Sequence, residues 1–398
     1  MKVVIAPDSF KGSLSAVEAA RAMRQGVLDA LPGADVGLCP MADGGEGTVE
    51  AIAEATGAEL VTREVAGPMP GGSVRATWAL LEPSAGGAPA LREHLDTTRR
   101  TGVIELAQAS GFSLVKDSER DPLIATTLGT GELIVDALDA GCASIIVGIG
   151  GSATVDGGTG IARALGYRFL DAAGKELPQG GGALERLDRI DTSGRDTRID
   201  GTRFLVASDV DNEMTGERGA ARIFGPQKGA TPAQVETLER GLDRLAQRMK
   251  EDLGVDVERM PGGGAAGGAG AGLMAFCGAK ITGGAELVAA AVGLDAWLRG
   301  ADLALTGEGS FDSQPLSGKT PAGVMRAAGE RGVPVVIIAG RISADAEPSM
   351  PGRTATFCLS SGPMTLQEAM GGGASLVRAG TARMMRLLLL LSDTQKRV

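Results

Sequence analysis

Short apolar runs alternate along the chain with polar loops and with segments of helical periodicity. The main runs are residues 3–6, 144–147, 204–207, 303–306 and 335–339. Such runs predict strands that are buried on both faces, as in a parallel sheet covered by helices. Most of them lead into loops rich in Gly, Asp, Ser and Thr, and ligands bind at the carboxyl ends of strands in sheets of this type. The pattern therefore predicts an α/β fold with a functional site built from these loops.

Three further segments have a different pattern. Residues 59–81 alternate between apolar and polar around a turn at 67–72, which predicts an antiparallel hairpin. Residues 232–253 have the charged, amphipathic pattern of a surface helix. Ser15 and Glu18 have the spacing of a capping box, so we expect a helix to begin there.

The chain has 398 residues, which is enough for two or three domains. We expect one parallel, Rossmann-like α/β domain made from both ends of the chain, residues 1–66 and 282–398. A second, mixed α/β domain, residues 67–281, would be inserted between them. The active site would then lie in the cleft between the two domains.

Composition excludes several classes of protein. The net charge is −10, from 39 basic and 49 acidic residues, which argues against nucleic acid or an anionic membrane as a partner. His94 is the single histidine and stands in a polar stretch, so a Ser-His-Asp triad or a His-ligated zinc site is not expected. The four cysteines lie far apart in apolar surroundings and are expected to be buried free thiols in a reducing cytoplasm: Cys39, Cys142, Cys277 and Cys358. The start of the chain does not have a signal-peptide pattern, and the apolar run at 387–391 is too short to span a bilayer, so we expect a soluble, cytoplasmic protein.

The first two polar loops carry charged groups at strand ends. Lys11, flanked by Ser9 and Ser13, stands between a predicted strand and a predicted helix, where backbone amides also favour anions. Asp43 and Glu46 are separated by a glycine pair and could point into one space. The alternative for these two acids is a helix cap with an early-turn Glu.

The third loop, residues 148–158, has the composition of a phosphate-binding loop. We expect Gly150, Gly151, Ser152 and Thr154 to surround a phosphate, with Asp156 presented beside it. The spacing also matches a dinucleotide fingerprint, with Asp171 about twenty residues further on. An NAD-dependent oxidoreductase is therefore the alternative from a different class, although the glycines at 157 and 158 interrupt the helix that this motif requires.

The later loops add acids and two lysines. Asp209 and Asp211 would share a face of an extended segment and offer oxygen ligands to Mg²⁺; the alternative is an Asp/Asn turn. Lys228 lies in a loop further along. The glycine run at 261–272 could serve either as a ligand cradle or as a surface for close helix packing.

The last loop offers Glu308, Asp312 and Lys319 after a predicted strand. It is not a P-loop, because Ser313 occupies the position where that motif requires Gly.

Acids that can hold Mg²⁺ and lysines that can neutralise phosphates are the groups used in phosphoryl transfer, which depends on positioning and electrostatics. We therefore expect a phosphotransferase. The expected catalytic residues are Lys11, Asp43, Asp209 and Asp312, and the expected metal ligands are Asp209 and Asp211. The expected substrate and phosphate contacts are Ser9, Ser13, Glu46, Gly150, Gly151, Ser152, Thr154, Asp156, Lys228, Glu308 and Lys319.

Six motifs, running in order along the chain, resemble those of the bacterial glycerate kinases. They are residues 8–15, 42–48, 129–134, 148–154, 224–231 and 304–309. The resemblance implies two unlike α/β domains and an enzyme, monomer or homodimer, that uses ATP and Mg²⁺ to phosphorylate D-glycerate. It points to the 2-hydroxyl, giving 2-phosphoglycerate and ADP, with 3-phosphorylation or a related hydroxy acid as the close variant. Val155 and Ser310 depart from the family, which usually has Asn and Arg at these positions.

Overall fold

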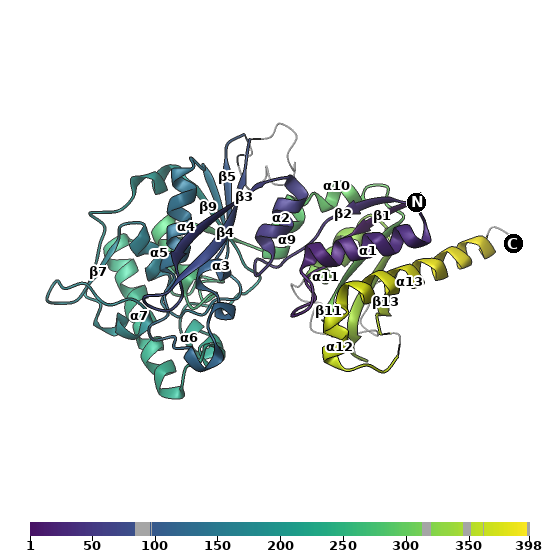
Figure 1. Ribbon diagram of the computed structural model, residues 1–398. Coiled ribbons are helices and arrows are strands. Elements are labelled where there is room, and N and C mark those ends of the chain that lie inside the picture. Colours follow the sequence, from purple (N-terminus) through teal and green to yellow (C-terminus); the bar gives the residue numbers. More distant parts are fainter. Residues whose placement is uncertain (84–95, 97, 313–319, 345–351, 361, 396–398) are drawn as a thin grey trace.

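The computed structural model describes residues 1–83, 96, 98–312, 320–344, 352–360 and 362–395. These residues form two main sheets, each with helices on both faces (Figure 1). The first sheet has five described strands, all parallel, in the order β13-β12-β11-β1-β2. Their bounds are Thr354–Cys358 (β13), Val335–Ile342 (β12), Leu303–Phe311 (β11), Lys2–Ile5 (β1) and Asp35–Leu38 (β2).

The second sheet is mixed and has six described strands in the order β10-β9-β6-β5-β4-β3. Their bounds are Lys280–Thr282 (β10), Arg203–Ala207 (β9), Ser144–Gly148 (β6), Thr101–Glu105 (β5), Ser73–Leu81 (β4) and Glu59–Ala66 (β3). β3 and β4 form the antiparallel hairpin that the alternating pattern predicts, and β4 pairs antiparallel with β5. The other pairs are parallel. The two unlike sheets confirm the expected α/β fold class.

Helices α1 (Ala16–Ala30) and α13 (Gly373–Gln395) cover the outer face of the five-stranded sheet (Figure 1). Val3 and Ile5 of β1 point into this layer. α1 begins at the predicted capping box, in which Ser15 and Glu18 bond each other's backbone amides. The cap satisfies amides that a helix start leaves without partners, which explains why the helix begins at this point.

Helices α2 (Thr48–Thr56) and α9 (Gly284–Ala291) lie between the two sheets (Figure 1). Their apolar side chains belong to one buried cluster with Val4 and Ala304 of the five-stranded sheet. Val103 and Ile146 of the six-stranded sheet belong to the same cluster. The two sheets therefore share one hydrophobic layer instead of having separate cores.

The far face of the six-stranded sheet is covered mainly by four helices. They are α4 (Leu128–Asp139), α5 (Thr159–Ala164), α7 (Pro232–Leu253) and α8 (Ala269–Cys277). α7 is the amphipathic helix that the pattern predicts at 232–253. The glycine run before α8 packs closely against the loop at 154–158, since a Cβ atom at Gly267 would overlap the carbonyl oxygen of Thr154. The structure thus uses this run for close packing, one of its two expected roles.

The division of the chain into domains at 66/67 and 281/282 stays a prediction. If the domains follow the sheets, the first boundary lies before Glu59, because β3 pairs along its whole length with β4. The turn at 67–72 then lies within one sheet.

Some details of the sequence analysis are wrong. β11 continues to Phe311, so the segment from Thr306 to Phe311 is a strand and not a loop. Cys358 is exposed, whereas the other three cysteines are buried as expected. His94 lies outside the described residues. Within the described ranges, every helix is too short or too polar to cross a membrane.

The close contacts of Gly44 lead to a test of stability. Gly44 has φ +88°, and a Cβ atom would overlap the carbonyl oxygen of Ala207 in β9. Gly57 also has a positive φ, +69°, but faces open space. Both Gly→Ala changes should cost about 1–3 kcal/mol through backbone strain. Gly44→Ala should cost about 1–3 kcal/mol more through overpacking, measured by urea unfolding. Equal losses in the two variants would show that the contact between the sheets is not tight.

Candidate active site

The loop that follows β2 crosses to the six-stranded sheet. We call residues 43–47 the acidic loop. Its Gly44 carbonyl accepts a hydrogen bond of 3.1 Å from the amide of Gly150, which follows β6. Cβ atoms at Gly44, Gly150 or Gly284 would each overlap backbone atoms across this contact. Since these positions carry no side chain, the acidic loop lies directly on the carboxyl ends of β6 and β9 and on the start of α9.

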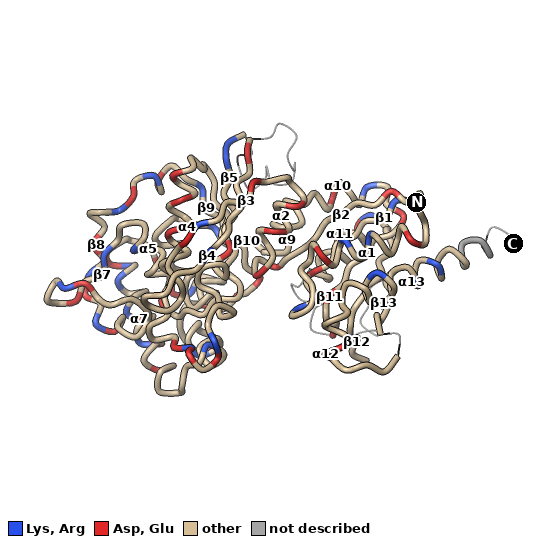
Figure 2. The backbone as a smooth tube through the Cα atoms, viewed as in Figure 1, with Lys and Arg blue, Asp and Glu red and all other residues tan. Residues whose placement is uncertain are grey.

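Four carboxylates from both sheets gather at this contact. We call them the junction carboxylates: Asp8, Asp43, Asp209 and Glu286. Asp43, Asp209 and Glu286 are exposed and Asp8 is half-buried, so a ligand can reach them. Figure 2 shows acidic positions around α2 and α9, between the two sheets. The structure thus brings Asp43 and Asp209, two expected catalytic residues, into one place.

Burial and repulsion between these carboxylates raise the pKa values of Asp8 and Asp209. Burial raises the pKa of Asp8, and the negative charge of Asp43 raises it further, while a hydrogen bond with Thr320 and the charge of Lys11 oppose the rise. Burial also raises the pKa of Asp209, and Asp43 and Glu286 add to the effect. Asp43 therefore acts electrostatically on carboxylates of both sheets.

Asp209 and Asp211 do not meet as a metal-binding pair. The Asp209 carboxylate accepts the amides of Gly284 at 2.8 Å and Ala285 at 3.1 Å, and so caps α9. Asp211 forms an exposed ion pair of 2.9 Å with Arg218. The two carboxylates therefore have separate partners, and of the two only Asp209 belongs to the junction.

Lys11 lies beside the junction carboxylates as an exposed side chain. Its neighbour Ser13 donates its hydroxyl to the carbonyl of Met370 at 2.8 Å, which ties the loop to the segment before α13. The amide of Ser9 donates to Asp8 at 2.6 Å.

Glu308 and Asp312 lie at the carboxyl end of β11, next to β1, since the amide of Asp8 donates to the carbonyl of Gly307 at 2.8 Å. Lys319 lies outside the described residues.

Asp156 and Lys228 are buried inside the six-stranded half of the molecule. Asp156 accepts hydrogen bonds from the amide and hydroxyl of Thr127 and from the amides of Gly158 and Gly160. Burial raises its pKa and these bonds oppose the rise. Asp156 is fully buried and holds the start of α5 in place, and the contact with a substrate or phosphate expected of it stays a prediction.

Lys228 joins two parts of the loop at 148–158. Its Nζ donates to Ser152 Oγ and to the carbonyl oxygen of Thr154, both at 2.7 Å. Only 3% of the residue is exposed, and burial lowers its pKa to about 7. Lys228 therefore stabilises this loop from the interior of the protein, and the phosphate contact expected of it stays a prediction.

In the loop at 148–158, some groups expected to contact a phosphate already have partners within the protein. The amide of Gly150 is already used by Gly44. Glu46 approaches Gly151 and accepts the hydroxyl of Ser113 at 2.9 Å. Glu46 therefore lies on the six-stranded side of the acidic loop.

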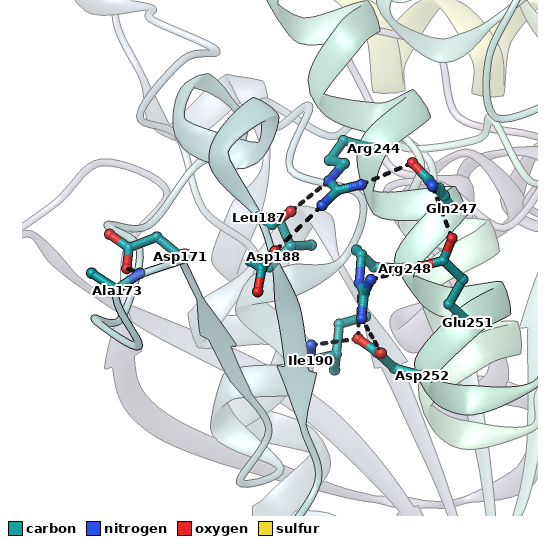
Figure 3. Close-up of polar contacts among 10 residues, drawn as sticks. All are labelled: Asp171, Ala173, Leu187, Asp188, Ile190, Arg244, Gln247, Arg248, Glu251 and Asp252. Atoms are coloured by element: carbon teal, nitrogen blue, oxygen red, sulfur yellow. Dashed lines mark hydrogen bonds and ion pairs between the residues drawn. The ribbon is translucent and has the colours of Figure 1, made fainter.

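The dinucleotide-binding interpretation is wrong. The strand before Asp171 is β7 (Arg168–Leu170), which pairs with β8 (Arg189–Asp191) in a separate antiparallel ribbon and does not belong to the described six-stranded sheet. Asp171 bonds the amides of its own turn, including that of Ala173 (Figure 3). Gly157 and Gly158 have positive φ, so the chain turns where the motif requires a helix. Asp171 cannot hold a ribose beside β6.

The sequence analysis missed two junction carboxylates. Asp8 lies in the loop that follows the first strand, and this position close to a strand end could have marked it as a candidate. Glu286 lies in the first turn of α9, where the sequence gives no signal of a functional role. It is assigned to the site because its charge acts on Asp209, which is distant in the chain.

The pKa of Lys228 predicts a pH-dependent stability. Its folded pKa of about 7 lies below the ordinary value of 10.5, so above pH 7 the unfolded state binds more protons. Between pH 7 and 9, the wild type should therefore gain about 2 kcal/mol of unfolding free energy relative to Lys228→Met. Lys250→Met, at an exposed lysine, should run parallel to the wild type in urea titrations. Parallel curves for Lys228→Met as well would mean that Lys228 stays charged.

Comparisons with known proteins identify the family of this chain. The model of the glycerate kinase family matches residues 3–389. A glycerate kinase of Halalkalibacterium halodurans is 46% identical over 376 residues, which are 94% of this chain and 95% of the relative. A glycerate 2-kinase of Escherichia coli is 45% identical over 373 residues, 94% of this chain and 94% of the relative.

Structural similarity covers the chain in the same way. A crystal structure from Salmonella typhimurium LT2, assigned as a glycerate kinase 2, superposes with a TM-score of 0.83 and 45% sequence identity. The match covers 99% of this chain and 99% of the other. With the family match over nearly its whole length, the chain belongs to the glycerate kinase family.

Proposed function

We propose that this protein transfers the γ-phosphoryl group of ATP to the 2-hydroxyl of D-glycerate, giving 2-phosphoglycerate and ADP. The observation that carries the proposal is the position of Asp43, whose charge acts on Asp8 in one sheet region and on Asp209 in the other. A phosphotransferase has to hold two substrates and compensate concentrated phosphate charge. Family membership and the names of the relatives support the choice of glycerate.

A magnesium ion fits the junction carboxylates. Repulsion among Asp8, Asp43 and Asp209 would be relieved by a cation between them. Among the described residues, no three acidic, His or Cys side chains surround a common point. Mg²⁺ in kinases often takes one or two carboxylates and completes its shell with water and phosphate oxygens, so two ligands suffice. We propose Asp43 and Asp209 as these ligands. When bound, the ion would compensate the charge of the phosphates.

The remaining steps use groups of the chain itself. Lys11 is exposed beside Asp8 and would bind a phosphate or the glycerate carboxylate. Asp8, with its raised pKa, would accept the proton of the attacking hydroxyl. Closure around both substrates would exclude water and so prevent hydrolysis of ATP.

The two departures from the family pattern have different surroundings. Val155 is fully buried in the core beside the six-stranded sheet, so its side chain does not reach a ligand. Ser310 lies in β11 directly across from Arg341 of β12, on the same face as Glu308. We propose that Arg341 supplies a positive charge close to the position where the family usually has Arg.

A coupled assay of ADP release tests the proposed function. D-glycerate should be phosphorylated faster than other small hydroxy acids, and ³¹P and ¹³C NMR should place the phosphate on the 2-hydroxyl. Product carrying the phosphate on the 3-hydroxyl would refute the proposed regiochemistry, and no reaction with D-glycerate would refute the function.

The separate partners of Asp209 and Asp211 predict different effects of their removal. Asp43→Asn and Asp209→Asn should each lower kcat roughly 100-fold and raise the Mg²⁺ concentration needed for half-maximal rate. Asp211→Asn is the matched control, since this exposed acid two residues away pairs with Arg218. It should change the Mg²⁺ titration less than about twofold. A strong shift in the Asp211 variant would instead support the metal pair that the sequence suggests.

A further inference from the structure

Glu105 is a buried acid that the proposed reaction does not use. It is the last residue of β5, near the middle of the six-stranded sheet, and only 1% of it is exposed. Its neighbour across the sheet is Gly148, against which the carbonyl of Gly44 lies closely. A buried carboxylate is costly unless it has strong partners, so its partners indicate what it is for.

The partners of Glu105 are the first amides of α2. Its Oε1 accepts the amide of Val49 at 2.5 Å, and the nearby backbone amide of Gly47 also favours the charged form. α2 begins at Thr48, directly after Gly47, which has φ +92° and no side chain that could cap the helix. Glu105 therefore supplies, from another sheet, the cap that this helix does not provide for itself.

The capped helix start is also the end of the acidic loop. Only three residues separate Gly47 from Asp43, and the Asp43 carboxylate accepts the amide of Gly45 at 3.0 Å. The loop is thus held by the sheet at two places, through the Gly44 carbonyl and through the Val49 amide that Glu105 accepts. Both attachments fix Asp43 relative to Asp209.

We propose that Glu105 is a positioning residue, which caps α2 from the six-stranded sheet and so holds Asp43 at the correct distance from Asp209. This inference rests on the proposed function. The charge is favoured by the two amides and by Gln108, whereas burial and the nearby Glu50 of α2 disfavour it. Burial dominates and raises the pKa of Glu105 to about 7. An acid therefore occupies this buried position although burial disfavours its charged form, which agrees with a specific role for its carboxylate.

The test replaces the carboxylate without changing its size. Glu105→Gln should lower kcat roughly 10- to 100-fold and raise the Mg²⁺ requirement, because groups that orient metal ligands have effects of this size. The KM for glycerate should change less than about threefold, since Glu105 does not touch the substrate. In the Asp43→Asn background, Glu105→Gln should cost less than about threefold, because its effect passes through Asp43.

Asp252→Asn is the matched control. Asp252 also accepts a backbone amide, that of Ile190 at 2.7 Å, and lies on α7 beside the β7–β8 ribbon, away from the acidic loop (Figure 3). This variant should keep the wild-type kcat and Mg²⁺ titration. An equal loss of kcat in both variants, or a full additional loss in the Asp43→Asn background, would overturn the proposal.

Hydrogen exchange gives a readout that does not depend on activity. In the wild type, amides in peptides covering residues 43–50 should exchange more slowly than is usual for a loop and a first helical turn. In Glu105→Gln the same amides should exchange at least tenfold faster. In Asp252→Asn their exchange should not change. If Glu105→Gln does not fold, Glu105→Asp, which shortens the side chain by one methylene, takes its place in each comparison. An inactive wild type with a protected loop would refute the function alone. An active wild type with an unprotected loop would refute the role of Glu105.

Discussion

The backbone of the acidic loop lies against the ends of two strands of the other sheet, and the functional site depends on this contact. It is possible because glycine occupies the positions where the two backbones meet: Gly44, Gly148, Gly150 and Gly284. Any Cβ atom at these positions would push the loop away by several tenths of an ångström or more. Since Asp43 is on this loop and Asp209 follows β9, the same contact sets the distance between them.

Bringing acids together in this way has an electrostatic cost. Burial is the main cause of the raised pKa values of Asp8 and Asp209, and the charge of Asp43 adds to each rise. The amides at the start of α9 and the charge of Lys11 offset some of it. Carboxylates that repel one another favour the binding of a cation, and of phosphate groups that bind together with that cation. This agrees with membership of a kinase family.

Three buried polar residues have structural roles that the sequence did not indicate. Asp156, Lys228 and Glu105 are each more than nine-tenths buried and bind backbone or hydroxyl groups of nearby loops. An acid or lysine in a glycine-rich loop has the same sequence pattern whether it faces a ligand or the interior. The difference depends on which other segment covers it, and for Asp156 and Lys228 the covering segments come from elsewhere in the chain.

Local sequence patterns correctly predict the elements with strong signals: the buried strands, the hairpin of β3 and β4, the capping box of α1 and the amphipathic α7. The sequence also identified Lys11, Asp43 and Asp209 as candidates, because charged groups at strand ends are visible in one dimension. Only the tertiary structure separated Asp209 from Asp211, buried Lys228 and brought Glu286 to the junction. These outcomes depend on contacts between segments far apart in the chain, and local periodicity contains no information about which distant backbone will lie against a given loop.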